Sequence, residues 1–105
     1  MDSQLKISGY RIELGDVEAN LLALPTVRDA VVTPVIKNGA AQSLAAFVVL
    51  SRQTEASHFE ITQSLRQQLA ERLPVYMLPR RFVFRDAFPM TANGKVDRAR
   101  LAQSL

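Results

Sequence analysis

Apolar and polar residues alternate along residues 4–12, on both sides of Ser8 and Gly9. This period of two predicts a two-stranded hairpin with Gly9 at its turn. In residues 15–24 the apolar side chains instead follow one face of a helix, and Pro25 ends that helix. The side chains expected to face the core of these two elements are Leu5, Ile7, Tyr10, Ile12, Val17, Leu21, Leu22 and Leu24.

Two strands are predicted next. Residues 27–36 are rich in β-branched side chains, and residues 37–40 have the composition of a turn. Residues 42–51 contain a mostly apolar run, which is typical of a central strand buried on both faces. We expect these two strands to pair antiparallel.

The longest predicted helix covers residues 55–73. Its apolar residues recur every four positions, and Phe59 is expected to support the same face. Pro74 ends this helix, and residues 75–79 form a linker bounded by prolines. The recurring apolar residues are Ile61, Leu65, Leu69 and Leu73.

Residues 81–85 read as a third strand, and residues 97–105 as a short terminal helix with Asp97 as its N-cap. The alternation of strands and helices lacks the regular spacing of a parallel sheet. The sequence therefore predicts an α+β fold, in which helices pack on a small three-stranded sheet of antiparallel type beside the N-terminal two-stranded hairpin.

Composition is that of one small globular domain. The chain has 105 residues, of which 48% are hydrophobic and 22% charged. It contains no cysteine, so no disulfide or thiolate metal site can form. No apolar run approaches the ~18–20 residues that cross a bilayer, and the N-terminus lacks the layout of a signal peptide. We expect a cytoplasmic protein with no membrane span.

The formal net charge is +3, but most basic residues are scattered along the chain. Aromatic residues make up only 7%, and no glycine–aromatic RNA-binding signature occurs. We therefore expect no nucleic-acid partner. A non-catalytic basic binding module is kept as an alternative, and it predicts an affinity that falls steeply with salt.

A complete active site cannot be assembled from the sequence. His58 is the sole histidine and reads as a solvated surface residue, so no metal-ligand spacing exists and no metal site is expected. No nucleophile elbow or phosphate-binding glycine loop occurs. The acidic residues Glu13, Asp16 and Glu18 suit the positive end of a helix. The chain is either an interaction module or a piece of an enzyme.

Lys95 stands out because it directly follows a predicted tight turn. Asn93 and Gly94 are the strongest tight-turn signal in this chain's C-terminal part, and they present Lys95 just beyond the turn. A long flexible cation on such a turn can reach an anion held on another domain. Taken alone, the same pattern also describes an ordinary hairpin with a solvated lysine.

Three segments together resemble the eighth, ninth and tenth core motifs of adenylate-forming enzymes. They are DSQLKISGYRIELGDVE at residues 2–18, LPVYMLP at residues 73–79 and PMTANGKVDR at residues 89–98. Their order and spacing also fit, and the resemblance covers essentially the whole chain. The family includes amino-acid adenylation domains of nonribosomal peptide synthetases, D-alanine–carrier protein ligases, acyl-CoA synthetases and luciferases.

The resemblance implies that residues 1–105 are the mobile C-terminal domain of such an enzyme, with residues 1–8 as hinge and first strand. The large N-terminal domain would lie outside this chain, so we expect a piece of a longer protein. Met90, together with the Arg-Arg-Phe sequence at residues 80–82, favours the branch of D-alanine–carrier protein ligases.

Site residues follow from the same resemblance. Lys95 corresponds to the catalytic lysine that contacts the acyl carboxylate and the α-phosphate, on a turn formed by Asn93 and Gly94. Asp2 corresponds to the hinge about which the domain rotates between half-reactions. The loop that lines the tunnel of the pantetheine thiol corresponds to Gly9, Tyr10 and Arg11.

The implied function is that of an ATP-dependent amino-acid–carrier protein ligase. Such an enzyme forms an aminoacyl adenylate and transfers the acyl group to the phosphopantetheine thiol of a carrier protein. ATP and Mg²⁺ would be bound mostly by the absent N-terminal domain, and the isolated domain should be folded but inactive. The partners would be that N-terminal domain and an acyl or peptidyl carrier protein. The alternative within the family is an acyl-CoA synthetase.

Overall fold

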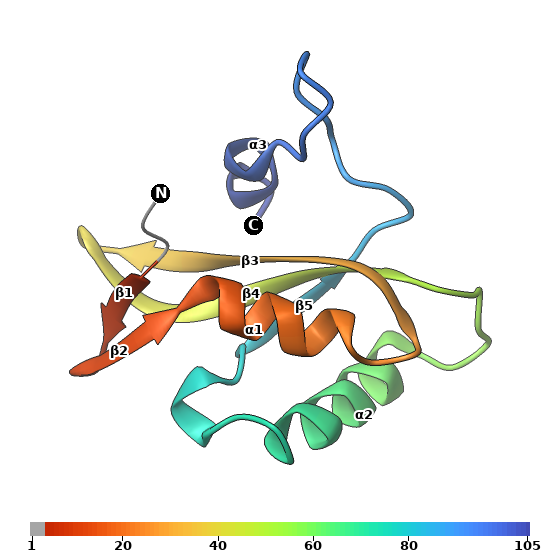
Figure 1. Cartoon of the computed structure of the whole chain (residues 1–105), viewed down its shortest axis with the longest axis horizontal. Helices are drawn as coiled ribbons and strands as arrows, with labels where there is room; N and C mark the ends of the chain where they lie inside the picture. The colour runs from red at the N-terminus through yellow and green to blue at the C-terminus, as the bar shows by residue number, and fades with distance from the viewer. Residues whose placement is uncertain (1–3) are drawn as a thin grey trace.

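The computed structural model describes residues 4–105, which form an α+β fold with two sheets (Figure 1). One sheet is the hairpin β1–β2, and the other is three-stranded in the order β3–β4–β5. The elements in chain order are β1 (Gln4–Ile7), β2 (Tyr10–Glu13), α1 (Leu14–Leu22), β3 (Val27–Lys37), β4 (Ala40–Leu50), α2 (His58–Ala70), the 3₁₀ helix η1 (Val75–Met77), β5 (Arg81–Phe84) and α3 (Arg98–Gln103).

Strand β4 is central and is buried on both faces, as its apolar run predicted. All residues from 44 to 49 are buried. Because successive side chains of a strand point to opposite faces, they contribute alternately to two apolar clusters. Leu44, Ala46 and Val48 belong to the first cluster, while Ala45, Phe47 and Val49 belong to the second.

The two clusters define two layers, one on each side of the three-stranded sheet. Figure 1 shows the hairpin β1–β2, α1 and α2 on one side of this sheet and α3 on the other. The first cluster correspondingly takes Ile12 from the hairpin and Leu69 from α2. The second cluster takes Phe88 and Leu101, the latter from α3. Both faces of the sheet are therefore covered, and each carries a different set of loops.

Strand β3 pairs antiparallel with β4, as expected, but β5 runs parallel to β4. The prediction of a sheet of antiparallel type is therefore wrong for its third strand. The chain leaves the end of β4, passes through α2 on one side of the sheet and re-enters at the start of β5. A helical crossover of this kind returns the chain to the end of the sheet at which β4 began, which makes the two strands parallel.

Helix α2 is shorter than predicted because its ends are set by local capping. Ser57 is the N-cap: its hydroxyl accepts the N–H of Glu60, whose carboxylate in turn accepts the N–H of Ser57. This capping box starts the helix at His58. Phe59 is 72% exposed, so its predicted place on the apolar face was wrong. Leu22 of α1 is likewise exposed rather than buried.

No helix among the described residues is long and apolar enough to cross a membrane.

Thr33 is a buried polar residue on β3 whose hydroxyl has no hydrogen-bond partner among residues 4–105. It lies two residues beyond Val31, so both side chains face the side of the sheet that α3 covers. A buried hydroxyl without a hydrogen-bond partner in the protein lowers the stability of a fold.

We expect Thr33→Val to raise the free energy of unfolding by about 1 kcal/mol, because valine has nearly the same shape and no hydroxyl to desolvate. Urea denaturation of the chain measures the change. The matched control is Val31→Thr, which introduces a buried hydroxyl on the same face and should lower the free energy of unfolding. A loss of stability in Thr33→Val would show that the hydroxyl is bonded in solution.

Candidate functional site

Lys95 lies in a small hairpin made by residues 89–97, called here the Lys95 hairpin. Met90 and Val96 form an antiparallel bridge, and the N–H of Asp97 donates to Pro89 O at 2.8 Å. Nearer the tip, the N–H of Thr91 donates to Lys95 O at 2.7 Å. The backbone on both sides of Lys95 is therefore fixed by hydrogen bonds.

The turn at the tip of the Lys95 hairpin needs its glycine. The N–H of Gly94 donates to Thr91 O at 3.0 Å, and Gly94 has a φ of 81°. This is a three-residue hairpin loop with glycine in the left-handed position. An Asn-Gly sequence favours a turn because both residues tolerate a positive φ. In this loop only Gly94 adopts one, and Asn93 does not.

The side chain of Lys95 is exposed at the tip of this hairpin and has no hydrogen-bond or ion-pair partner among residues 4–105. Figure 1 shows the loop projecting away from the sheet on the side of α3. An ammonium group fully in water stabilises a negative charge only weakly. Strong electrostatic catalysis by Lys95 therefore requires a second surface that excludes water around it.

The base of the Lys95 hairpin is held by α3 and an ion pair. Asp97 caps α3 by accepting the N–H of Arg100, as predicted. The next residue, Arg98, donates two hydrogen bonds to the Glu18 carboxylate of α1, at 2.6 and 2.8 Å. These bonds and the negative charge of Glu18 raise the pKa of Arg98 above its ordinary value. Glu18 was read from the sequence as a helix-end acid, and this partner was missed.

Gly9 lies at the turn of the hairpin β1–β2, as predicted. Ser8 and Gly9 have φ values of 52° and 83°, so both central residues of this two-residue turn are left-handed. A Cβ atom placed on Gly9 would meet nothing within 4 Å. The glycine is therefore required locally by its backbone angle and not by crowding within the described chain. A partner that approaches this turn closely would add a second reason.

The turn of this hairpin is followed by an aromatic stack that the sequence did not reveal. The rings of Tyr10 and Tyr76 are stacked, with centroids 4.0 Å apart and an interplanar angle of 12°. Both residues are still partly open to solvent, at 49% and 41% exposure. Tyr76 lies in the segment 75–79 that was predicted to be a linker. Its placement beside Tyr10 joins the segments that resemble the eighth and ninth motifs into one surface.

The segment that carries Tyr76 is held in place by buried side chains and by Arg66 of α2. Met77 and Pro79 are buried. Arg66 of α2 donates to Pro79 O at 3.1 Å and lies over the ring of Phe82, with its guanidinium carbon 5.8 Å from the ring centroid. Tyr76 is thereby presented from a fixed backbone.

The remaining predicted site residues are Arg11 and Asp2. Arg11 is exposed on β2, opposite Lys6 of β1. Asp2 lies outside the described residues. His58 is exposed, as expected, and its ring lies 4.9 Å from that of Phe84.

The structure does not bring Lys95 and Gly9 together. The hairpin β1–β2 packs in the layer of α1 and α2, whereas the Lys95 hairpin leaves the opposite side of the three-stranded sheet with α3 (Figure 1). The sheet between them is a packed core, so the two loops cannot serve one binding site within this chain. They are two separate surfaces of one domain.

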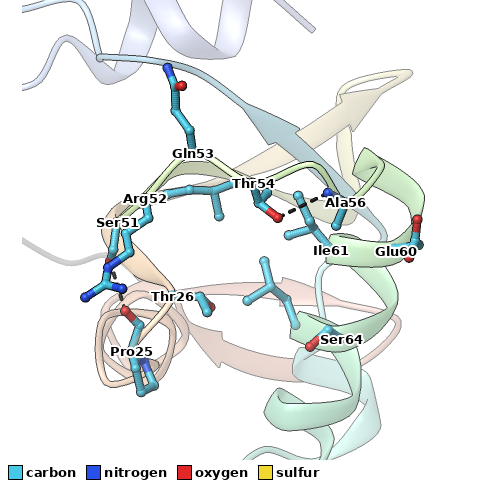
Figure 2. Close-up of a pocket in the computed structure, with 12 residues that line it drawn as sticks. Pro25, Thr26, Ser51, Arg52, Gln53, Thr54, Ala56, Glu60, Ile61 and Ser64 are labelled. Carbon is cyan, nitrogen blue, oxygen red and sulfur yellow. Dashed lines mark hydrogen bonds between the residues drawn. The ribbon is translucent and has the colours of Figure 1, made fainter.

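A pocket of about 700 Å³ lies between the start of α2, the segment that leaves β4 and the turn before β3. Figure 2 shows its wall, in which Ser51 donates to Pro25 O and Thr54 accepts the N–H of Ala56. Its charged lining residues are Arg52 and Glu60, and the Glu60 carboxylate is already used in the capping box. None of the predicted site residues lines this pocket.

Within residues 4–105, no three His, Asp or Glu side chains are grouped in a way that could hold a metal ion.

Comparison with known proteins places the chain in a family. Residues 16–95 match the model of the AMP-binding enzyme C-terminal domain, and this match includes Lys95. The chain is 39% identical over 105 residues to a D-alanine–D-alanyl carrier protein ligase of Bacillus velezensis, covering 100% of this chain and 21% of that protein. A ligase of the same name from Bacillus mycoides is 43% identical over 101 residues, covering 96% of this chain and 20% of that protein.

Solved structures have the same fold. An acyl-CoA synthetase of Brucella canis matches with a TM-score of 0.82 and 31% identity, over 99% of this chain and 19% of that one. An amide bond synthetase of Marinactinospora thermotolerans matches with a TM-score of 0.85 and 24% identity, over 99% of this chain and 20% of that one. The chain spans about a fifth of the length of the curated relatives it matches. By its sequence and its fold, the chain belongs to the family of AMP-binding enzyme C-terminal domains of adenylate-forming ligases.

Proposed function

We propose that this chain is the mobile C-terminal domain of an ATP-dependent amino-acid–carrier protein ligase, and that it supplies the catalytic lysine, Lys95. The observation that carries the proposal is the placement of the Lys95 hairpin and the hairpin β1–β2 on opposite sides of one packed sheet. A domain built in this way can present one loop in each of two half-reactions if it rotates between them. In the parent enzyme, Asp2 is the hinge residue of that rotation.

In the first half-reaction a carboxylate oxygen of the amino acid attacks the α-phosphorus of ATP. The bond between that phosphorus and the bridging oxygen breaks, and pyrophosphate leaves. Negative charge accumulates on the α-phosphate oxygens during this exchange. Lys95 contacts the carboxylate and the α-phosphate once the N-terminal domain has excluded water around it, and its ammonium group stabilises the transition state.

In the second half-reaction the domain presents the other hairpin. The thiol of a phosphopantetheine arm gives its proton to solvent, and its sulfur attacks the carbonyl carbon of the adenylate. A thioester bond forms, the bond between that carbon and the phosphate oxygen breaks, and AMP leaves with the electron pair of that bond. Gly9, Tyr10 and Arg11 line the path of this arm. Nothing in residues 4–105 lies within 4 Å of the position of a Cβ on Gly9, so this chain itself leaves the path open.

The partners in this proposal are the N-terminal domain of the same enzyme and a carrier protein that bears phosphopantetheine. ATP binds mostly to the N-terminal domain, and Mg²⁺ accompanies it there. The carrier-protein ligases of Bacillus, at 39–43% identity, support an amino acid as the activated substrate and a carrier protein as the acceptor. Alone, this chain is expected to be folded and inactive.

An acyl-CoA synthetase is the second candidate, favoured by the 31% identity to the Brucella canis protein of that name. Coenzyme A also ends in a phosphopantetheine thiol, so the same hairpin would serve it. The acceptor distinguishes the two candidates: a carrier protein for the first and free coenzyme A for the second.

In the full-length parent enzyme, we expect Lys95→Ala to lower amino-acid-dependent ATP–pyrophosphate exchange about a hundredfold or more. The reason is the loss of a charge that acts only in the transition state. The measurement is exchange over a panel of amino acids that includes D-alanine.

The matched control is Lys37→Ala. Lys37 is also exposed and also adjoins an Asn-Gly turn, formed by Asn38 and Gly39. This variant should exchange at the wild-type rate. Equal exchange by Lys95→Ala and wild type would make Lys95 a surface lysine. Activity with non-amino acids and free coenzyme A would favour the second candidate.

We expect Gly9→Ala to slow transfer from a preformed aminoacyl adenylate to the carrier thiol while adenylate formation continues. Alanine adds a methyl group on the proposed thiol path and also strains a backbone with a φ of 83°, at a cost of about 1 kcal/mol. Single-turnover thioester formation measures the transfer step.

Gly39→Ala separates the two effects. Gly39 has a φ of 77° and equally open surroundings, so this variant carries the same backbone strain at another turn, the one between β3 and β4. It should leave both half-reactions intact. Equal slowing of transfer in both variants would attribute the effect to stability and contradict the proposed role of Gly9.

A further inference from the structure

The ion pair between Glu18 and Arg98 joins three elements that belong to different layers. Arg98 is the first residue of α3, and Glu18 lies in α1 on the other side of the sheet. The Glu18 Oε2 atom that accepts from Arg98 also accepts the N–H of Val32 at 2.8 Å. Val32 belongs to β3, the edge strand. The carboxylate therefore connects α1 to α3 around the edge of the sheet.

The geometry of this contact is specific. The two terminal guanidinium nitrogens of Arg98 each donate to a different carboxylate oxygen of Glu18, Nη1 to Oε2 at 2.6 Å and Nη2 to Oε1 at 2.8 Å. The Glu18 side chain is only 12% exposed, whereas that of Arg98 is 54% exposed. A two-point contact between a planar guanidinium and a carboxylate fixes direction as well as distance. A lysine at position 98 would keep the charge but could not make this contact.

The Lys95 hairpin depends on its base for its direction. Residues 91–95 are all exposed, so the core does not hold the tip. At the base, α3 has only six residues, and Leu101 is its buried side chain. A helix this short is not stable by itself and takes its orientation from tertiary contacts. Arg98 lies three positions after Lys95, so its contact with Glu18 ties the base of the hairpin to α1.

We propose that Glu18 and Arg98 are positioning residues for Lys95, and that their ion pair fixes the direction in which the Lys95 hairpin leaves the sheet. The catalytic part of this inference rests on the proposed function of Lys95. The pair does not contact substrate in this scheme. It keeps the lysine where the moving domain can deliver it, since misplacing a catalytic group by about 1 Å can cost about a hundredfold in rate.

The structural part is tested on this chain alone by ¹⁵N relaxation. In Arg98→Lys and Glu18→Gln, we expect the order parameters of the Gly94 and Lys95 amides to fall from the level of a rigid backbone, about 0.85, toward about 0.6. The matched control is Arg100→Lys, the same change two residues further along the exposed part of α3, which should leave them unchanged. Thermal unfolding of each variant verifies that it is folded.

The catalytic part is tested in the full-length parent enzyme. We expect Arg98→Lys and Glu18→Gln to lower kcat of ATP–pyrophosphate exchange about tenfold with little change in KM, because a contact made in the transition state is misplaced. Transfer from preformed adenylate should proceed at the wild-type rate. In a Lys95→Ala background neither change should lower exchange further, because the two sites act through one group.

Unchanged order parameters in both variants would overturn the inference whatever Lys95 does. A loosened hairpin with wild-type exchange, in an enzyme that Lys95→Ala disables, would overturn the positioning role. Equal losses in both half-reactions would overturn it in favour of a general stabilising role. Wild-type exchange by Lys95→Ala would refute the proposed function and the positioning role with it. In that case the order parameters would still differ between Arg98→Lys and Arg100→Lys, which would show that the structural part of the inference holds while the function of Lys95 does not.

Discussion

Burial of β4 on both faces is the constraint from which the rest of the architecture follows. A strand that contributes apolar side chains alternately to two clusters cannot leave either face of its sheet in water. One face is covered by α1, α2 and the hairpin β1–β2, and the other by α3 with the segment before it. The two candidate functional loops belong to different layers: the hairpin β1–β2 to the first, and the Lys95 hairpin to the side of α3. Their separation is thus a direct consequence of a core two layers deep.

Three glycine turns in this chain show how little a local signal says about role. The turns at Gly9, Gly39 and Gly94 all place glycine at positive φ, with open space where a Cβ would be. Two of them have the sequence Asn-Gly, and in those at Gly9 and Gly39 the residue before the glycine is left-handed as well. What differs is the surroundings: one adjoins a tyrosine stack, one joins two core strands, and one carries a lysine on a short exposed hairpin. Position in the fold, and not turn chemistry, gives each a different potential function.

Glu18 illustrates how one carboxylate can satisfy several needs at an edge strand. It accepts an N–H of β3 that the sheet ladder does not use, and it neutralises a guanidinium from the opposite layer. A carboxylate that is largely removed from water requires such partners, because burying an unpaired charge is costly. The contact also links the segment that resembles the eighth motif to the one that resembles the tenth. A segment near the start of the chain is thereby joined to one near its end.

The sequence by itself determined what depends on neighbouring residues: the glycine turns, the two-sided strand, the antiparallel pairing of β3 with β4, the Asp97 cap and the family resemblance. Tertiary structure decided what depends on distant residues. The parallel pairing of β5, the Tyr10–Tyr76 stack and the contact between Glu18 and Arg98, which are 80 positions apart, were not foreseen. Periodicity and turn propensity act over a few residues, whereas these contacts arise only when the crossover through α2 and the two-layered core bring remote segments together.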